Sequence, residues 1–419
     1  MRSTGSTFLL MFGVLCSLLL VPVGAGAGDA ASIGADAKAL VQEGQYDKAI
    51  EELRAGYSLF PYNETLRHDL AQAYLSQAQR NLNLSRFTEA AENYSQAREL
   101  YPGESRFTLM RGVALYFAKN FDSARAELNQ LGESAEALTY LGKICYDTGD
   151  LNGALDNWRR AETLGSDPGV KKLIAKAERE LPVESRMDKG YSSMFDITFD
   201  AELPPGLSAE VLDALETAYN SVGTDLGLFP TARIPVLLYT KQEYSSVTNG
   251  PDWSGGLYDG KIRLPLGGVS NMTPQLRGVL FHEFTHVLVA EITGGNVPTW
   301  LNEGLAQIEE FKEYGAAMAA QGAPLAKEKL LSMRSLSGSF VGLDRESAGL
   351  AYRQSYSLTS FMVQRYGWYA MQNVLKNLKD RVKIEVAVSK ALADWSLDMP
   401  AVQREWRESL GLPAEAAAP

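Results

Sequence analysis

Two of the three histidines in this 419-residue chain, His282 and His286, lie four positions apart, and Glu283 directly follows the first. On an α-helix, four residues advance by about 400° and rise about 6 Å, so the two imidazoles share one face. Nitrogen ligands placed in this way can bind one Zn²⁺ at roughly 2.0–2.1 Å. Glu283 projects about 100° away, where its carboxylate can take a proton from a water that the metal activates. The pattern H-E-x-x-H therefore favours the chemistry of a zinc hydrolase.

The residues around this pattern predict the helix that it needs. Thr273 is a good N-cap, Pro274 suits the first helical position, and Gly294-Gly295 ends the segment. The alternative is a chance pentapeptide whose histidines are satisfied in a core. The scarcity of histidine and the caps at both ends weigh against that alternative. Apolar residues recur between the two ends near helical spacing: Leu276, Val279, Leu280, Val287 and Leu288.

A catalytic zinc site needs a third protein ligand, and Glu303 is the candidate. It lies in the segment 298–306, which predicts a second helix with Thr299 as its cap. A loop through Gly294–Asn296 can fold this helix back against the first. Two histidines and one glutamate leave a fourth position for water, as in catalytic zinc sites. Taken alone, Glu303 would be a solvated glutamate that complements the helix dipole, but the upstream motif favours a ligand.

H-E-x-x-H followed by Trp300-Leu-Asn-Glu-Gly-Leu-Ala306 resembles the gluzincin metallopeptidases, and more closely the peptidase-MA-like domains found beside tetratricopeptide repeats. The resemblance implies that His282, His286 and Glu303 bind zinc, that Glu283 is the base, and that the substrate is a peptide or protein. It runs from about Met194 to about Leu412 and includes four weaker segments: Trp253–Gly256, Ala351–Ser355, Arg365–Gly367 and Glu405–Arg407.

Two features depart from the large zinc aminopeptidases of that family. The interval between His286 and Glu303 is shorter, and Lys261–Gly268 replaces the G-x-M-E-N strand that captures a substrate's amino terminus. These departures weigh against exopeptidase action, although an extended strand here could still pair with a substrate backbone. The resemblance further points to Tyr352, with Tyr356 one turn later as the other candidate, for the donor that stabilises charge on the carbonyl oxygen. The chain has 19 tyrosines, and many will simply straddle core and water.

The N-terminus predicts export to the periplasm or the extracellular space. Arg2 precedes an apolar run from Phe8 to Val23 and then Gly24–Ala27, which is the layout of a signal peptide over residues 1–27. The run is short for a spanning helix, and an uncleaved anchor is the alternative. No later segment predicts a membrane span. The formal net charge of −11 and the lack of a basic patch argue against nucleic acid as a partner.

Residues 33–180 predict an all-α solenoid of tetratricopeptide repeats. Small residues recur at Ala49, Ala90, Ala124 and Ala154, scattered around the period of about 34 residues that marks this repeat. Alanine lets paired helices approach closely, so that each repeat buries its face on the next. Such solenoids either bind a protein partner on their concave face or only position the neighbouring domain.

The remainder predicts an α+β metallopeptidase domain over 191–412, with a small sheet followed by the zinc-binding helix pair. The whole chain is then an exported zinc metallopeptidase that hydrolyses peptide bonds with Glu283 as general base, and repeats that recruit or position partners. The alternative is a catalytically silent repeat adaptor or assembly protein of the cell envelope. The other expected segments are a polar linker at 181–190, strands at 195–199, 235–239 and 261–264, a helix at 208–226, helices from about 350 to 410, and a loose tail at 413–419.

Overall fold

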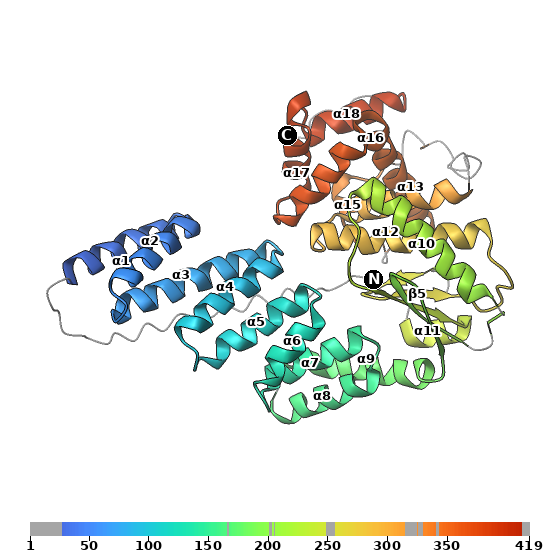
Figure 1. Cartoon of the computed structure of the whole chain (residues 1–419). Coiled ribbons are helices and arrows are strands. Elements are labelled where there is room, and N and C mark those ends of the chain that lie inside the picture. The colour runs from blue at the N-terminus through green and yellow to red at the C-terminus, as the bar shows by residue number, and fades with distance from the viewer. Residues whose placement is uncertain are drawn as a thin grey trace. The chain divides into compact units, whose positions relative to one another are not determined.

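The chain folds into two compact units, seen in a computed structural model (Figure 1). The larger unit holds Ala175–Pro419 with the short piece Asp147–Gly149, and the smaller unit holds most of the chain before Ala175. Of the expected segments, the predicted signal peptide except Ala27, Trp253 and the tail 413–419 lie outside the described residues. The structure describes residues 27–165, 167–200, 203–204, 206–248, 256–314, 325, 330–340 and 343–412.

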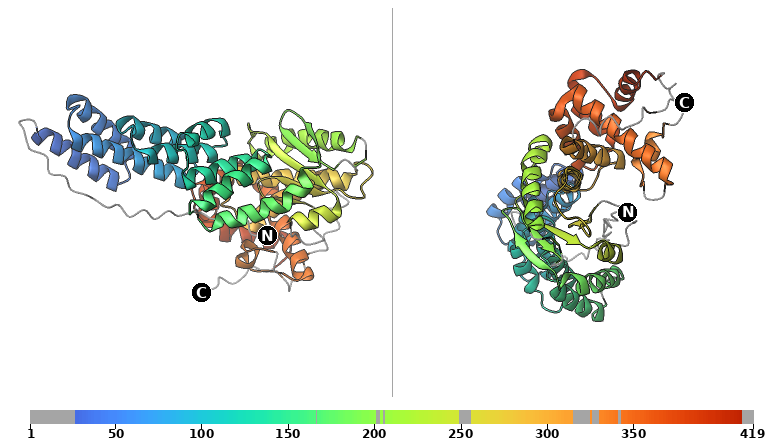
Figure 2. Two further views of the ribbon diagram at one scale, coloured as in Figure 1. Left: turned by 90° about the horizontal axis from the view of Figure 1, so that it is seen from below. Right: turned by 90° about the vertical axis from the view of Figure 1, so that its right-hand side faces the viewer.

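The smaller unit is a run of paired helices, as Figure 1 and Figure 2 show. The four alanines that marked the repeat are each fully buried where neighbouring helices meet, which confirms their role in close packing. Its helices are α1 (Ala27–Gln42), α2 (Tyr46–Leu59), α3 (Glu64–Asn83), α4 (Phe87–Leu100), α5 (Ser105–Phe117), α6 (Phe121–Asn129), α7 (Ala135–Asp147) and α8 (Leu151–Thr163). The next helix, α9 (Gly169–Glu184), begins in this unit and ends in the larger one.

The larger unit contains a five-stranded sheet in the order β1-β2-β3-β5-β4. The three inner strands run parallel, and the two outer strands are antiparallel to their neighbours. The alternation of side chains sends Val236 and Leu238 of β3 into the main core, against α10 (Leu207–Leu226) and the helices that follow. The strands are β1 (Asp188–Tyr191), β2 (Phe195–Phe199), β3 (Ile234–Tyr239), β4 (Leu257–Tyr258) and β5 (Ile262–Pro265).

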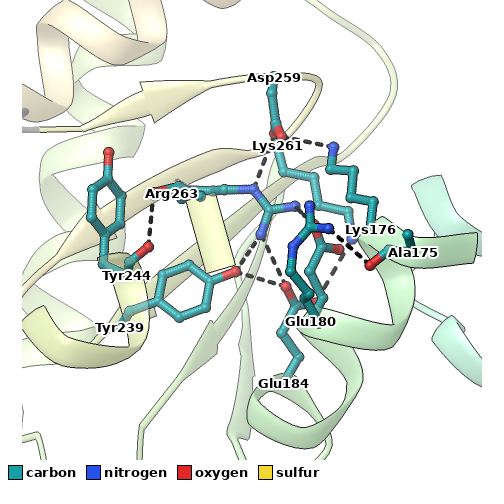
Figure 3. A network of polar contacts seen from close by, with 11 residues as sticks. Ala175, Lys176, Glu180, Glu184, Tyr239, Tyr244, Asp259, Lys261 and Arg263 are labelled. Carbon is teal, nitrogen blue, oxygen red and sulfur yellow. Dashed lines mark hydrogen bonds and ion pairs between the residues drawn. The ribbon is translucent and has the colours of Figure 1, made fainter. Parts of the chain in front are cut away.

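The opposite face of the sheet carries a buried network of charges (Figure 3). Arg263 of β5 is 1% exposed, and its guanidinium contacts Glu180 and Glu184 of α9, each at 3.0 Å. It also contacts the Asp259 carboxylate at 3.1 Å and the Tyr239 hydroxyl. Because each carboxylate accepts hydrogen bonds from a buried cation, the end of α9 is held on the sheet as part of the larger unit.

The stretch 181–190, expected to be a linker, is largely regular structure. It holds the end of α9, which includes Pro182, and the beginning of β1. Its polar residues suggested an exposed connection, whereas Glu184 uses its charge inside the network around Arg263. Local composition cannot show that a carboxylate has a distant buried partner.

The remaining helices complete an α+β unit, as expected. The long helix α16 bends at Gly367, whose φ of 81° and ψ of 166° are not helical. Among the helices of the described ranges, none is both long and apolar enough to cross a membrane. These elements are α11 (Lys241–Thr248), α12 (Pro274–Thr293), α13 (Thr299–Tyr314), α15 (Met333–Ser337), α16 (Arg345–Lys379), α17 (Ile384–Ala391), the 3₁₀ turn Ala393–Trp395 and α18 (Met399–Ser409).

Candidate metal centre

The helix α12 carries the H-E-x-x-H pattern and has the ends that its sequence predicts. The Thr273 hydroxyl accepts a hydrogen bond from the Leu276 amide at 3.1 Å, and Gly294 ends the helix in the left-handed conformation with φ 59°. Most of its side chains are buried, because α10 packs on one side and α13 on another. The histidines are therefore presented from a rigid, central element.

The helix α13 carries Glu303 and is packed between α12 and α16. Gly304 permits this packing, since a Cβ there would lie only 2.6 Å from the carbonyl oxygen of Ser355 and closer still to the Thr359 hydroxyl. Any side chain at this position would push α13 away from α16. The neighbouring Glu303 is thereby held against the face of α12 that bears the two histidines.

The structure brings His282, His286 and Glu303 together. The Oε2 atom of Glu303 lies 3.5 Å from Nε2 of His282 and 3.8 Å from Nε2 of His286. One donor atom from each residue lies within 4.8 Å of the others, so the three could hold a metal ion. The side chains are 13–17% exposed, which leaves one side of the cluster open to water.

A fourth residue, Glu310, completes the cluster and was missed from the sequence. Its Oε2 atom lies 2.8 Å from Nδ1 of His282, which can donate a proton to it. That hydrogen bond leaves Nε2 of His282 as the atom that faces Glu303. The signal was available in the spacing, because Glu310 follows Glu303 by two helical turns and so occupies the same face of α13.

Burial and neighbouring carboxylates set the protonation of the cluster. Burial opposes charge on His282, but hydrogen bonds to Glu303 and Glu310 raise its pKa well above the usual value. Burial lowers the pKa of His286, although Glu303 acts in the opposite sense. Burial, together with the charges of Glu303 and Glu310, raises the pKa of Glu283 to about 7. A metal cation placed between these groups would supply the positive charge that the proton on His282 otherwise supplies to the neighbouring carboxylates.

Comparison with known families assigns the part of the chain that holds this cluster. Residues 218–411, which contain both helices of the cluster, match the Peptidase MA superfamily. The chain carries a Peptidase MA superfamily domain. Residues 37–73 and 75–133 match models of the tetratricopeptide repeat, so the resemblance predicted from the motifs is confirmed for both parts. The chain matches no curated protein in sequence.

The donors of this peptidase MA domain suit zinc. In a tetrahedral zinc site with bonds of roughly 2.0–2.1 Å, ligand atoms are about 3.4 Å apart. The separations of 3.5 and 3.8 Å from Glu303 to the two histidines are close to this value, and all three donor atoms lie within 4.8 Å of one another. Two imidazole nitrogens and one carboxylate oxygen are also a poor match for Mg²⁺ or Ca²⁺, which prefer oxygen ligands throughout.

The peptidase MA domain places the two candidate tyrosines differently. Tyr352 of α16 packs edge-on against Phe340, with ring centroids 5.3 Å apart. Burial first, and then the charges of Glu303, Glu283 and Glu310, raise its pKa, so its hydroxyl lies within electrostatic reach of the cluster. Tyr356 instead packs against Phe311 of α13 at 5.0 Å. Of the two, Tyr352 is the one associated with the cluster.

Proposed function

We propose that the protein is an exported zinc metallopeptidase that hydrolyses peptide bonds in a peptide or protein substrate. His282, His286 and Glu303 are the metal ligands, and Glu283 is the general base. The observation that carries the proposal is the convergence of Glu303 on both histidines, at 3.5 and 3.8 Å, with Glu283 on the adjacent helical position. Membership of the Peptidase MA superfamily supports a peptidase of this kind.

Each residue of the cluster has a distinct part in this chemistry. A bound zinc ion lowers the pKa of a coordinated water and polarises a carbonyl oxygen. Glu283 can receive a proton on its carboxylate and pass it to the leaving amine. Glu310 orients His282 through the 2.8 Å contact with Nδ1. Tyr352 is proposed as the donor that stabilises charge on the carbonyl oxygen.

The N-terminal repeats and the leader suggest where and on what the enzyme acts. Tetratricopeptide repeats generally bind other proteins, so the repeat unit is proposed to recruit or position a protein partner or substrate. The signal-like layout of residues 1–27 supports export.

The decisive experiment compares the purified wild-type protein with the variant Glu283→Gln on a proteome-derived peptide library, read by mass spectrometry. The amide keeps the shape of the carboxylate but cannot accept the proton. Cleavage by the wild type that disappears in Glu283→Gln, with metal content retained, supports the proposal and also reports the preferred cut sites. Equal cleavage by both proteins would remove Glu283 from the reaction. No cleavage by the metal-loaded wild type would favour a silent repeat adaptor.

A further inference from the structure

Gly256, the residue before β4, lies directly against the carboxylate of Glu283. A Cβ added to Gly256 would lie 2.6 Å from Oε1, 2.8 Å from Cδ and 2.9 Å from Cγ of Glu283. Non-bonded carbon atoms prefer separations of about 3.5–4.0 Å, so a Cβ at residue 256 would overlap the end of this side chain. No side chain larger than hydrogen fits there while Glu283 keeps its place.

The backbone conformation does not explain why residue 256 is glycine. Gly260, the other glycine of this hairpin, has a φ of 105°, which favours glycine over other residues. Gly256 is not among the glycines of positive φ in the described chain, so its φ does not by itself require glycine. The requirement for glycine comes from the space that Glu283 occupies.

The Glu283 side chain is nearly enclosed by its neighbours. It is 6% exposed, so a change in the atoms packed around it changes where its carboxylate can lie. The main chain next to Gly256 is held in place by two sets of contacts. The strand β4 pairs with β5, and the Asp259 carboxylate just after β4 forms ion pairs with Arg263 and Lys176 (Figure 3).

We propose that Gly256 is a positioning residue for Glu283. Its bare main chain forms the wall that keeps the carboxylate beside His282, and the missing side chain leaves the room that the carboxylate needs. The catalytic consequence rests on the proposed function, in which Glu283 is the general base. The contact between the two residues does not, and it can be tested in protein that has no metal and no activity.

The contact is tested by a double-mutant cycle on thermal unfolding of the full chain. Gly256→Ala in the wild-type background should lower Tm by about 3–8 °C, as expected for overpacking in a domain of this size. The same change in the Glu283→Ala background should leave Tm within about 1 °C, because the colliding atoms are gone. Gly349→Ala is the matched control, since the nearest atom to its Cβ would be the end of Arg353 at 3.4 Å, and it should not lower Tm. An equal loss of Tm in both backgrounds, or none in either, would overturn the contact.

The catalytic role is tested on the peptides that the wild type cleaves. Gly256→Ala should lower kcat at least 10-fold, with KM and zinc content nearly unchanged, because the base is displaced while ligands and substrate site remain. In the Glu283→Asp background, Gly256→Ala should lower kcat by much less than 10-fold, because the shorter aspartate side chain no longer reaches the main chain at residue 256. Full kcat in Gly256→Ala, or multiplicative losses, would remove Gly256 from the placement of the base. If the wild type cleaves nothing, the proposed function fails, and the unfolding cycle still decides the contact.

Discussion

The Nδ1 atom of His282 lies 2.8 Å from the Oε2 atom of Glu310, seven residues beyond the candidate ligand Glu303 on the same helix. One helix thus supplies both a group that can bind the metal and a group that orients another ligand. This contact orients the imidazole so that Nε2 of His282 faces Glu303.

Replacing Glu310 by Gln should weaken zinc binding by about 10- to 100-fold without unfolding the protein, because the imidazole loses its charged acceptor. Competition with a chromophoric chelator measures the Kd. Glu313→Gln is the control, since Glu313 lies one turn further along α13 and pairs with Arg277 at 2.6 Å. Equal Kd values for wild type and Glu310→Gln would show that His282 needs no such support.

Adding zinc to the metal-free protein should raise its free energy of unfolding. At a free concentration of 100 times Kd, binding adds about 2.7 kcal/mol to the free energy of unfolding, which calorimetry or thermal unfolding detects. Glu303→Gln and His286→Ala should lose most of this gain. His68→Ala should keep it, because the third histidine is exposed on α3. A gain that survives in Glu303→Gln would place the metal elsewhere.

Tyr352→Phe should lower kcat by about 10²–10³-fold if its hydroxyl stabilises charge on the carbonyl oxygen, while zinc content stays the same. The matched change Tyr356→Phe should have little effect, because that ring packs on Phe311. Steady-state kinetics and metal analysis of both variants make the comparison. An unchanged kcat in Tyr352→Phe would assign that ring to packing against Phe340.

The stability of the metal-free protein should depend on pH through Glu283. Burial and nearby carboxylates raise its folded pKa to about 7, above the unfolded value of 4.5. As the pH rises between these values, the unfolded chain loses the proton while the folded chain keeps it, so stability falls, by up to about 3 kcal/mol. The free energy of unfolding of the wild type, relative to Glu283→Gln, should therefore be higher at pH 4.5 than at pH 8. If urea denaturation gives the same difference in free energy of unfolding between wild type and Glu283→Gln at both pH values, the pKa of Glu283 is not raised by folding.

Arg263→Met should destabilise the larger unit by about 3–5 kcal/mol, because it removes the guanidinium that contacts the buried carboxylates of Glu180 and Glu184, each at 3.0 Å, while Lys261 contacts Glu184 only at 3.8 Å. Arg233→Met is the control, since Arg233 and Asp196 are about half exposed and such pairs contribute less than about 1 kcal/mol. Chemical denaturation measures both. Similar small losses in the two variants would show that the network around Arg263 relaxes without it.

Elements with strong local signals could be predicted from the sequence. The helix α12 was found because its N-cap, its proline and its terminal glycine all lie in one segment. The strand β2 was found from the alternation of its residues and β3 from its apolar run. The proximity of Glu303 to the two histidines was predicted from H-E-x-x-H and the segment Trp300–Ala306 taken together. The short outer strands were missed, since β1 reads Asp-Lys-Gly-Tyr and β4 has only two residues.

What was missed depends on contacts between distant segments. Glu180 and Glu184 look like polar helix and linker residues, and only the fold places them around Arg263. The need for glycine at position 256 likewise depends on a side chain from a distant segment, Glu283 of α12. Spacing along one helix, in contrast, carries information, and Glu310 could have been found from its position two turns after Glu303.

The helix α9 begins among the repeats and ends in the sheet unit, since the boundary between the two units falls between Ile174 and Ala175. Suppose that genetic exchange replaces the repeats of this chain by those of a related protein. If the crossover falls after Pro182, the new helix must itself carry a glutamate at position 180 to pair with Arg263, and a chain without it would be less stable. A crossover before Ala175 keeps that acceptor with its sheet. The boundary at which repeat arrays can be exchanged in this architecture therefore lies within a helix.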